Sequence, residues 1–358
     1  MKIYGYVVAR DDEALTIVDL SDPTAPAFKG SLQGAGSPNY LDYPTDIVVR
    51  YPYAYTVDNS YYDGLSIFDI RNPSAISRVG GLLGSVSANY LSRCFRIVLE
   101  GNYAYVTGSD GLTIVNISDV TAPRTVGNLA AWAFAYHLVK DGDTCYLTVG
   151  DRISAVDVSD LTAPAELVLY PYPGSGAGAP NYLNNPRGIY KDGNVIYICA
   201  EVDDALTAWS WNPPADPVQL GVIRGAGSPN FLNTAQLVIV RNKLAYVATQ
   251  GDHGLTIIDV SDPTTMSYKG GVYSTSYMWE PWGMKLRKNY AYLCGRVYGV
   301  TAVDISDPEA PTVEGNIQGA GSPNYLDGCY GIDIHAFPER GNPNLDQLLY
   351  RHVERMGR

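Results

Sequence analysis

The phrase LTIVDLSDP at residues 15–23 recurs with variations six more times along the chain. The seven copies are about 41 to 53 residues apart and begin at Leu15, Leu65, Leu112, Ile153, Leu206, Leu255 and Val300. This period is typical of a four-stranded propeller blade and is longer than the roughly 33 or 34 residues of common helical repeats. We therefore expect one short structural unit repeated seven times.

Each unit has the same internal order. Within residues 46–80, the segments DIVV, YAYTV, LSIFDI and SRVGG read as four strands separated by Pro, Gly and Asn. We name these strands A, B, C and D from the hub outward. The C strand is apolar on both faces, which is typical of a sheet enclosed by neighbouring sheets. In five copies it ends at a pair that starts a tight turn: Asp22-Pro23, Asn72-Pro73, Asn212-Pro213, Asp262-Pro263 and Asp307-Pro308.

The two ends of the chain predict ring closure. The chain begins in a B strand, KIYGYVV, and its last A strand, GIDIHAF at 331–337, has no B strand after it. We expect this A strand to complete the blade begun by residues 2–32. The prediction is an all-β, seven-bladed propeller of four-stranded antiparallel blades over residues 1–337, in which the sheets bury one another's faces.

Residues 338–358 form a separate C-terminal tail. Helical spacing on one face predicts a short helix there, with Leu345, Leu348, Leu349, His352, Val353 and Met356 on that face. The helix either packs on the rim of the propeller or serves self-association or docking to a partner.

The repeated phrases resemble those of a known family. LTIVDLSDP (15–23), LSIFDIRNP (65–73), LTIVNISDV (112–120), LTIIDVSDP (255–263) and VTAVDISDP (300–308), with NYAYV at 102–106, are similar to the repeats of LVIVD-repeat β-propeller proteins. The copies ISAVDVSDL (153–161) and LTAWSWNPP (206–214) depart from the pattern. The resemblance implies the fold over nearly the whole chain, and it favours an extracellular or cell-surface location, but it implies no chemistry.

Composition disfavours several classes of partner. The net charge is −12 and no basic cluster occurs, so a nucleic-acid or anionic-membrane partner is not expected. No apolar run is long enough to span a bilayer, and the first residues lack the apolar core of a signal peptide. The five cysteines fall within or at the starts of expected strands, so we interpret them as buried apolar side chains without a disulfide framework.

A second repeat lies between the D strand of one blade and the A strand of the next. It reads GAGSPNYL at 34–41, GSVSANYL at 84–91, GAGAPNYL at 176–183, GAGSPNFL at 225–232 and GAGSPNYL at 319–326. In a meander these D–A connections share one face of the ring with the B–C loops, and we call it the top face. Its glycines, proline and asparagine predict a rigid loop with a local Asx-type hydrogen bond and an aromatic anchor.

The alternative for these inserts is multivalent binding. Equivalent amide and aromatic groups would then contact a polymer such as a glycan: Asn39, Tyr40, Asn89, Tyr90, Asn181, Tyr182, Asn230, Phe231, Asn324 and Tyr325.

Two tiers of residues around the hub differ most between repeats. Alignment of the A strands gives a first tier of Thr45, Phe95, Tyr136, Arg187, Gln236, Trp282 and Tyr330. The second tier is Asp46, Arg96, His137, Gly188, Leu237, Gly283 and Gly331. Aromatic walls with a few polar groups are typical of a small-molecule pocket. Asp46, Arg96 and His137, from consecutive blades, are expected to form either a charged site or an inter-blade ion pair that holds the ring closed.

Residues that would carry catalysis are few. The four histidines have no metal-binding spacing, and no phosphate loop or nucleophile elbow occurs, so no catalytic residue, metal or cofactor is assigned. The segments GSDGL (108–112) and GDHGL (251–255) are interpreted as B–C turns rather than calcium loops. Asp11, Asp12, Glu13, Asp203 and Asp204 are interpreted as solvated hairpin tips.

Together these features favour a non-enzymatic binding or structural scaffold. Its top face and channel mouth would meet a carbohydrate or protein ligand. One alternative is a hydrolase or lyase that holds a cation or small molecule in the channel through Asp46 and main-chain carbonyls. Another is a propeller subunit of a larger assembly.

Overall fold

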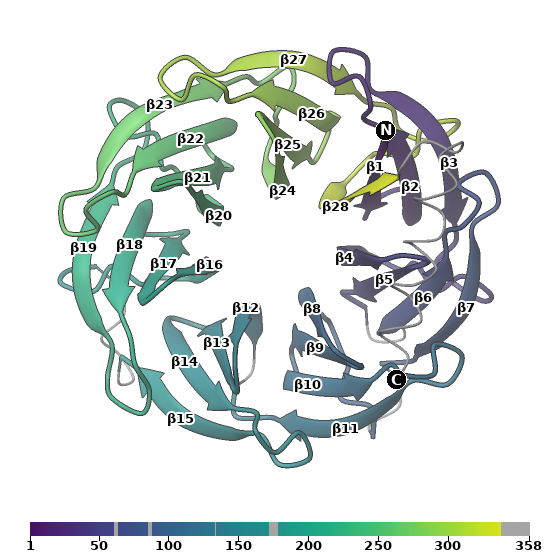
Figure 1. Cartoon of the computed structure of the whole chain (residues 1–358), viewed down its shortest axis with the longest axis horizontal. Helices are drawn as coiled ribbons and strands as arrows, with labels where there is room; N and C mark the ends of the chain where they lie inside the picture. Colours follow the sequence, from purple (N-terminus) through teal and green to yellow (C-terminus); the bar gives the residue numbers. More distant parts are fainter. Residues whose placement is uncertain (61–63, 85–87, 133, 172–177, 338–358) are drawn as a thin grey trace.

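The computed structural model describes residues 1–60, 64–84, 88–132, 134–171 and 178–337. Over these residues the chain forms seven four-stranded antiparallel sheets arranged as the blades of a closed ring, with no helix (Figure 1). The predicted seven-bladed propeller is thus confirmed. The tail at 338–358 lies outside the described residues, so its predicted helix stays a prediction.

The strands follow the predicted order from hub to rim. The A strands surround the channel and are β4 (Pro44–Arg50), β8 (Arg96–Glu100), β12 (Ala135–Asp141), β16 (Pro186–Asp192), β20 (Ala235–Arg241), β24 (Pro281–Arg287) and β28 (Cys329–Phe337). The B strands are β1 (Lys2–Ala9), β5 (Tyr53–Asp58), β9 (Tyr103–Gly108), β13 (Thr144–Val149), β17 (Val195–Ala200), β21 (Leu244–Thr249) and β25 (Tyr290–Gly295).

The two outer strands of each blade complete the set. The C strands are β2 (Ala14–Asp19), β6 (Leu65–Asp69), β10 (Gly111–Asn116), β14 (Arg152–Asp157), β18 (Ala205–Ser210), β22 (Gly254–Asp259) and β26 (Gly299–Asp304). The D strands are β3 (Ala27–Gln33), β7 (Ser77–Leu82), β11 (Arg124–Leu129), β15 (Ala165–Tyr170), β19 (Val218–Arg224), β23 (Ser267–Tyr273) and β27 (Thr312–Ile317).

The ring closes where the ends of the chain meet. Strand β28 pairs antiparallel with β1, in a register that places Lys2 opposite Phe337 and Val7 opposite Ile332. The sheet order is therefore β28-β1-β2-β3, and in Figure 1 the last strand lies beside the first. This confirms the predicted closure.

The predicted turn after the C strand also contacts the preceding blade. The Oδ1 atom of Asp22 accepts a hydrogen bond from the Thr24 N–H at 3.0 Å. The carbonyl of the residue that follows the turn aspartate or asparagine lies against a D-strand glycine of the preceding blade, where a Cβ atom would be within 2.4 Å of it. The pairs are Gly30–Pro73, Gly80–Val120, Gly127–Leu161, Gly221–Pro263, Gly270–Pro308 and Gly315–Pro23. Glycine is required there because the two backbones approach closely.

The two repeats that depart from the pattern compensate for each other. Trp209 stands where every other C strand has a smaller apolar residue, and Ala155 stands where four of the other six have isoleucine. Both are fully buried in one cluster between neighbouring blades. The Trp209 indole N–H donates to the Thr207 hydroxyl at 2.7 Å. Because protein cores are packed to a nearly constant density, the tryptophan fills space that the alanine leaves.

Candidate functional site

The inserts lie on the face of the B–C turns, as predicted, and their amides are bound to the backbone. Four asparagine side chains donate to the carbonyl six residues earlier, at or just after the end of the D strand. The pairs are Asn39–Gln33, Asn89–Leu83, Asn230–Arg224 and Asn324–Gln318, at 2.6 to 2.9 Å. These bonds span a longer loop than the expected Asx-type bond. The leucine that ends each insert is buried.

Aspartates of the B–C turns hold the inserts in place. Asp252 accepts hydrogen bonds from the N–H groups of Gly227 and Asn233, and Asp203 accepts from those of Gly178 and Asn184. These contacts join the B–C turn of a blade to the D–A connection that leads into the same blade. Asp203 is therefore a loop anchor, which differs from its interpretation as a solvated hairpin tip.

The insert aromatics also have partners within the protein. The ring of Phe231 stacks on Tyr273 with centroids 4.4 Å apart, and arginine side chains lie over the rings of Tyr40 and Tyr182. The backbone φ of all five aromatic residues is near +50°. Tyr90 exposes 44% of its surface. Most of these rings therefore anchor the loops.

First-tier side chains close the channel at its top end. Trp282 and Tyr330 stack with centroids 4.6 Å apart, and Phe95 meets Tyr136 edge-on at 5.2 Å. The Arg187 guanidinium lies 4.1 Å from the Tyr136 centroid and pairs with Glu201. Only about 30 Å³ of cavity remains at this level. Thr45 and Gln236 are buried and complete the tier.

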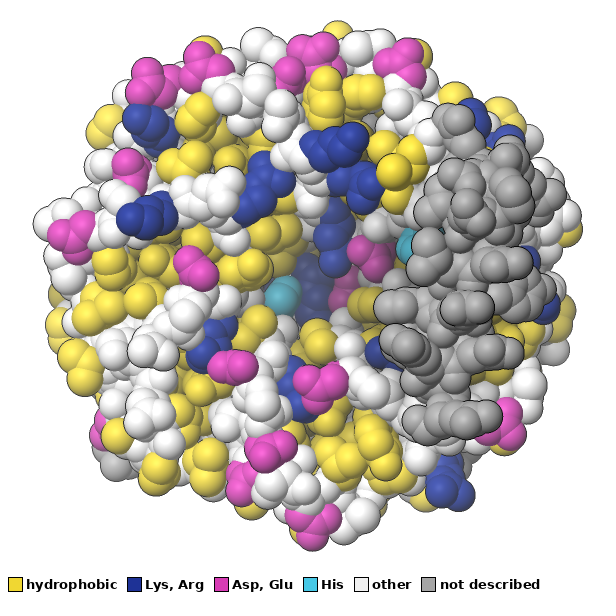
Figure 2. Space-filling model, in the orientation of Figure 1, with side chains coloured by type: hydrophobic (Ala, Val, Ile, Leu, Met, Phe, Trp, Pro, Cys, Tyr) yellow, Lys and Arg dark blue, Asp and Glu magenta, His cyan; other side chains and the backbone are white. Residues whose placement is uncertain are grey.

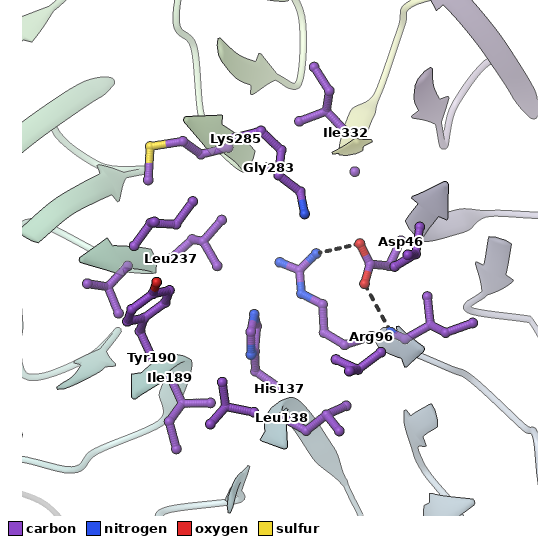
Figure 3. Close-up of a pocket in the computed structure, with 18 of the residues that line it drawn as sticks. Asp46, Arg96, His137, Leu138, Ile189, Tyr190, Leu237, Gly283, Lys285 and Ile332 are labelled. Atoms are coloured by element: carbon purple, nitrogen blue, oxygen red, sulfur yellow. Dashed lines mark hydrogen bonds and ion pairs between the residues drawn. The ribbon is translucent and has the colours of Figure 1, made fainter. Parts of the chain in front are cut away.

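The second tier brings together the three predicted charged residues. An Arg96 nitrogen lies 3.5 Å from the Asp46 carboxylate, which also accepts the Ile97 N–H at 3.0 Å. His137 lies on the neighbouring A strand (Figure 3).

The second-tier glycines have a packing role. A Cβ atom on Gly188 or Gly283 would lie 2.6 to 2.7 Å from a carbonyl of the next A strand, and one on Gly331 would lie 3.0 Å from the backbone of β4. Glycine lets these inner strands approach one another, whereas the charged second-tier side chains lie against the channel.

A further charged pair was missing from the sequence prediction. Lys285 and Asp333 lie two positions after the second tier on β24 and β28, and their side chains are 3.3 Å apart. Alternation along a strand places the second and fourth positions on the same face. This period of two could have pointed to Lys285 and Asp333 from the sequence. The structure follows it, because the fourth positions are all partly exposed and the third positions are all buried. The buried third-position residues are Ile47, Ile97, Leu138, Ile189, Val238, Met284 and Ile332.

Burial changes the ionisation of two of these groups in opposite directions. It raises the pKa of the Asp46 carboxyl, although Arg96 and the Ile97 N–H oppose the effect. Burial, together with the positive charges of Arg96 and Lys285, lowers the pKa of His137 well below its usual value. The His137 Nδ1 atom is buried and has no hydrogen-bond partner among the described residues. We therefore treat His137 as a neutral imidazole.

A cavity of about 480 Å³ lies below the first tier, on the side of the A–B turns. It reaches from Asp46, Arg96 and His137 to Lys285 and Arg241, and aliphatic side chains form most of its wall (Figure 3). Figure 2 shows charged side chains inside the hollow at the centre of the ring. The larger space therefore lies towards the bottom face, whereas the sequence prediction placed the working surface on the top face.

The described residues contain no group of three or more histidine, cysteine or acidic side chains that would hold a metal ion. In the same part of the chain, no helix has the length and apolar character needed to cross a bilayer.

Comparison with known proteins identifies the repeat. The model of the LVIVD repeat matches residues 4–33, 43–82, 94–130, 234–274 and 282–318, together more than half of the chain. The unmatched segment between the third and fourth matches contains both copies that depart from the pattern. No curated protein matches the chain.

Solved structures show the same fold at low sequence identity. The periplasmic gluconolactonase PpgL of Pseudomonas aeruginosa is 13% identical with a TM-score of 0.71, covering 94% of this chain and 100% of that one. A protein of Bacteroides fragilis proposed to be a 6-phosphogluconolactonase is 11% identical with a TM-score of 0.70, covering 94% and 98%. A functionally unknown protein of Desulfotomaculum acetoxidans is 12% identical with a TM-score of 0.65, covering 94% and 99%.

Proposed function

We propose, from the premise that the chain belongs to the LVIVD-repeat family, that this protein is a non-enzymatic binding protein whose ligand site is the central channel. The observation that carries the proposal is the 480 Å³ cavity, because it combines a mostly apolar wall with a few charged groups. Ligand pockets commonly have this composition and a volume of roughly 300 to 1,000 Å³.

A neutral fluorescent probe tests the channel as a small-molecule site. 1-Aminoanthracene is apolar and uncharged, so it reports on the cavity without testing any charge preference. We expect its fluorescence to rise on binding, with one site per chain. Val98→Trp places an indole at a half-buried position of the wall and should abolish this signal. Binding that survives in Val98→Trp, or no binding to the parent protein, would contradict the proposal.

A top-face site for a carbohydrate or protein is a second proposal, and exposed aromatic side chains support it. Of the exposed aromatic residues in the described part of the chain, five lie on D–A connections: Tyr43, Tyr90, Phe134, Tyr277 and Trp279. Aromatic faces are common platforms for sugars and proteins. Glycan-array binding that is lost in a Tyr277→Ala/Trp279→Ala double variant but kept in Val98→Trp would favour this surface over the channel.

A hydrolase or lyase in the channel is the other alternative. It is supported by the opposite pKa shifts of Asp46 and His137, since such pairs divide acid and base roles in active sites. Two proteins of similar fold are described as lactonases. Hydrolysis of glucono-δ-lactone, followed by acid release at constant pH, tests it: a rate that falls in His137→Gln would favour an enzyme, and a rate equal to the buffer rate would favour binding alone.

A further inference from the structure

The channel is more positive than the molecule that surrounds it. The chain carries a net charge of −12, yet the cavity is lined by Asp46 and three cations, Arg96, Arg241 and Lys285. Asp333 on the same face of β28 pairs with Lys285 at 3.3 Å, so two carboxylates stand against three cations and one positive charge is in excess. Arg241 on β20 and Arg287 on the adjacent A strand β24 form no ion pair with any described residue. An unbalanced positive charge in a concave site attracts anions.

The acidic and basic groups at the bottom end of the channel are separated. The last residues of β8, β12 and β16 are Glu100, Asp141 and Asp192, whereas β20 and β24 end in Arg241 and Arg287. Glu100 and Asp141 pair with Lys140 and Lys191 respectively. The basic side of the mouth therefore keeps its charge and leads inward to Lys285.

Two cations converge at the inner end of the cavity. In Figure 3 the Lys285 ammonium and the Arg96 guanidinium point towards the same part of the channel. Both act on the ionisation of Asp46 and of His137, so the four groups share one neighbourhood. The Arg96 guanidinium donates to the Asp46 carboxylate and to the Trp282 carbonyl, both at 3.5 Å, the long end of a hydrogen bond. It has five N–H donors in all, so donors remain for another acceptor.

Most of the remaining wall of the cavity is aliphatic. The fourth positions of the other A strands are mostly apolar and half-buried, and second-tier Leu237 adds to them. The apolar fourth-position side chains are Val48, Val98, Val139 and Ile239. Sugar hydroxyls placed against this wall would lose hydrogen bonds to water without gaining new ones, which is unfavourable. A small inorganic anion would leave the wall unused.

We infer that the channel binds a small amphiphilic carboxylate, with its carboxylate between Arg96 and Lys285 and its apolar body along the Val48–Val98–Val139 wall. This inference rests on the proposed function, because it names the class of ligand for the same cavity. Charge-assisted hydrogen bonds would hold the head. Apolar burial would hold the body.

Competition against 1-aminoanthracene tests the class of ligand. Three competitors separate the two features of the proposed ligand. Octanoate has both the apolar chain and the negative charge, 1-octanol has only the apolar chain, and acetate has the negative charge with almost no chain. We expect octanoate to displace the probe at a concentration at least roughly tenfold lower than 1-octanol or acetate does. A tenfold difference in affinity is about what one charge-assisted contact would contribute. Equal displacement by 1-octanol would overturn the anionic part of the inference, and equal displacement by acetate would overturn the apolar part. Failure of the probe itself to bind would instead overturn the proposed function.

Variants identify the residues that hold the head. A Lys285→Met/Asp333→Asn double variant removes the ammonium together with its ion-pair partner, so it should weaken octanoate binding roughly tenfold while leaving 1-octanol unchanged. Lys269→Met is the matched control, since that lysine pairs with Glu309 on the outer rim. An Asp46→Asn/Arg96→Gln double variant removes both partners of the inner pair, so no single buried charge is left behind. Octanoate binding that is unchanged in both channel variants, with melting curves that show folded protein, would overturn the placement of the carboxylate.

Discussion

The carboxylate of Asp12 accepts a hydrogen bond from the backbone N–H of Asp327 at 2.8 Å, across 315 residues of sequence. It also accepts the N–H of Gly321 at 3.0 Å. Asp12 lies in the first B–C turn and Gly321 lies in the last insert, so these bonds tie the two ends of the chain together above the β28–β1 pairing. Asp252 makes the same two bonds within the ring, at Gly227 and Asn233.

Asp12→Ala should destabilise the protein by about 1 to 3 kcal/mol, because two backbone donors lose a charged acceptor. Urea unfolding, followed by tryptophan fluorescence, measures the free energy of unfolding. Asp216→Ala is the control: this exposed aspartate on a C–D turn makes no comparable bond, so we expect a change within about 0.5 kcal/mol. Equal effects of the two substitutions would contradict the role of Asp12 at the seam.

The repeat and the alternation of its residues predict the blades and their closure, because both properties belong to single segments of sequence. The role of Asp12 could not be predicted in that way. Its partners belong to another repeat and meet it only after the blades have packed. The same limit applies to the glycine contacts such as Gly315 with Pro23.

The hub was predictable in part. Comparison of equivalent positions found Asp46, Arg96 and His137, which the structure brings into one cavity. The comparison covered only two positions of each A strand and so missed Lys285 and Asp333. Both lie two residues further along their strands, on the same face as the second tier. Which end of the channel is open depends on how Trp282, Tyr330 and their neighbours fill the first tier. Sequence alone does not give that packing.

Gly283→Ala should destabilise the ring and change the channel. The added Cβ atom would lie 2.6 Å from the Tyr330 carbonyl, so β24 and β28 would have to separate. The cost should be about 1 to 3 kcal/mol, as in other overpacked sites. Gly36→Ala is the matched control, since a Cβ atom there meets nothing within 4 Å. Urea unfolding of both variants checks the prediction, which is wrong if both behave like the parent.

His137→Gln should flatten the dependence of stability on pH between about 5 and 7. The pKa of His137 is lowered in the folded protein, below the value of about 6.5 in the unfolded chain. As the pH falls through about 6.5, the unfolded chain takes up a proton that the folded protein does not, so stability falls by up to about 1.4 kcal/mol per pH unit.

The groups around His137 stay the same in that comparison. Asp46, whose raised pKa acts in the opposite direction, and the cations Arg96 and Lys285 are present in both proteins. The difference between the two pH profiles, measured by urea unfolding at pH 5, 6, 7 and 8, therefore reports on His137 alone. Parallel profiles would show that His137 does not remain neutral in the folded protein.

Thiol labelling should reveal the seam that Asp12 closes. All five cysteines are free and buried, and burial raises the pKa of the Cys145 thiol to about 12, so labelling of the native protein by iodoacetamide should be slow. Cys329 lies in the closing strand β28 opposite Ala9, whereas Cys199 lies in β17, outside the closing blade. Local opening of the seam should expose Cys329 before global unfolding. In Asp12→Ala, mass spectrometry of labelled peptides should show faster labelling at Cys329 with Cys199 unchanged, and equal acceleration at both sites would indicate global unfolding instead.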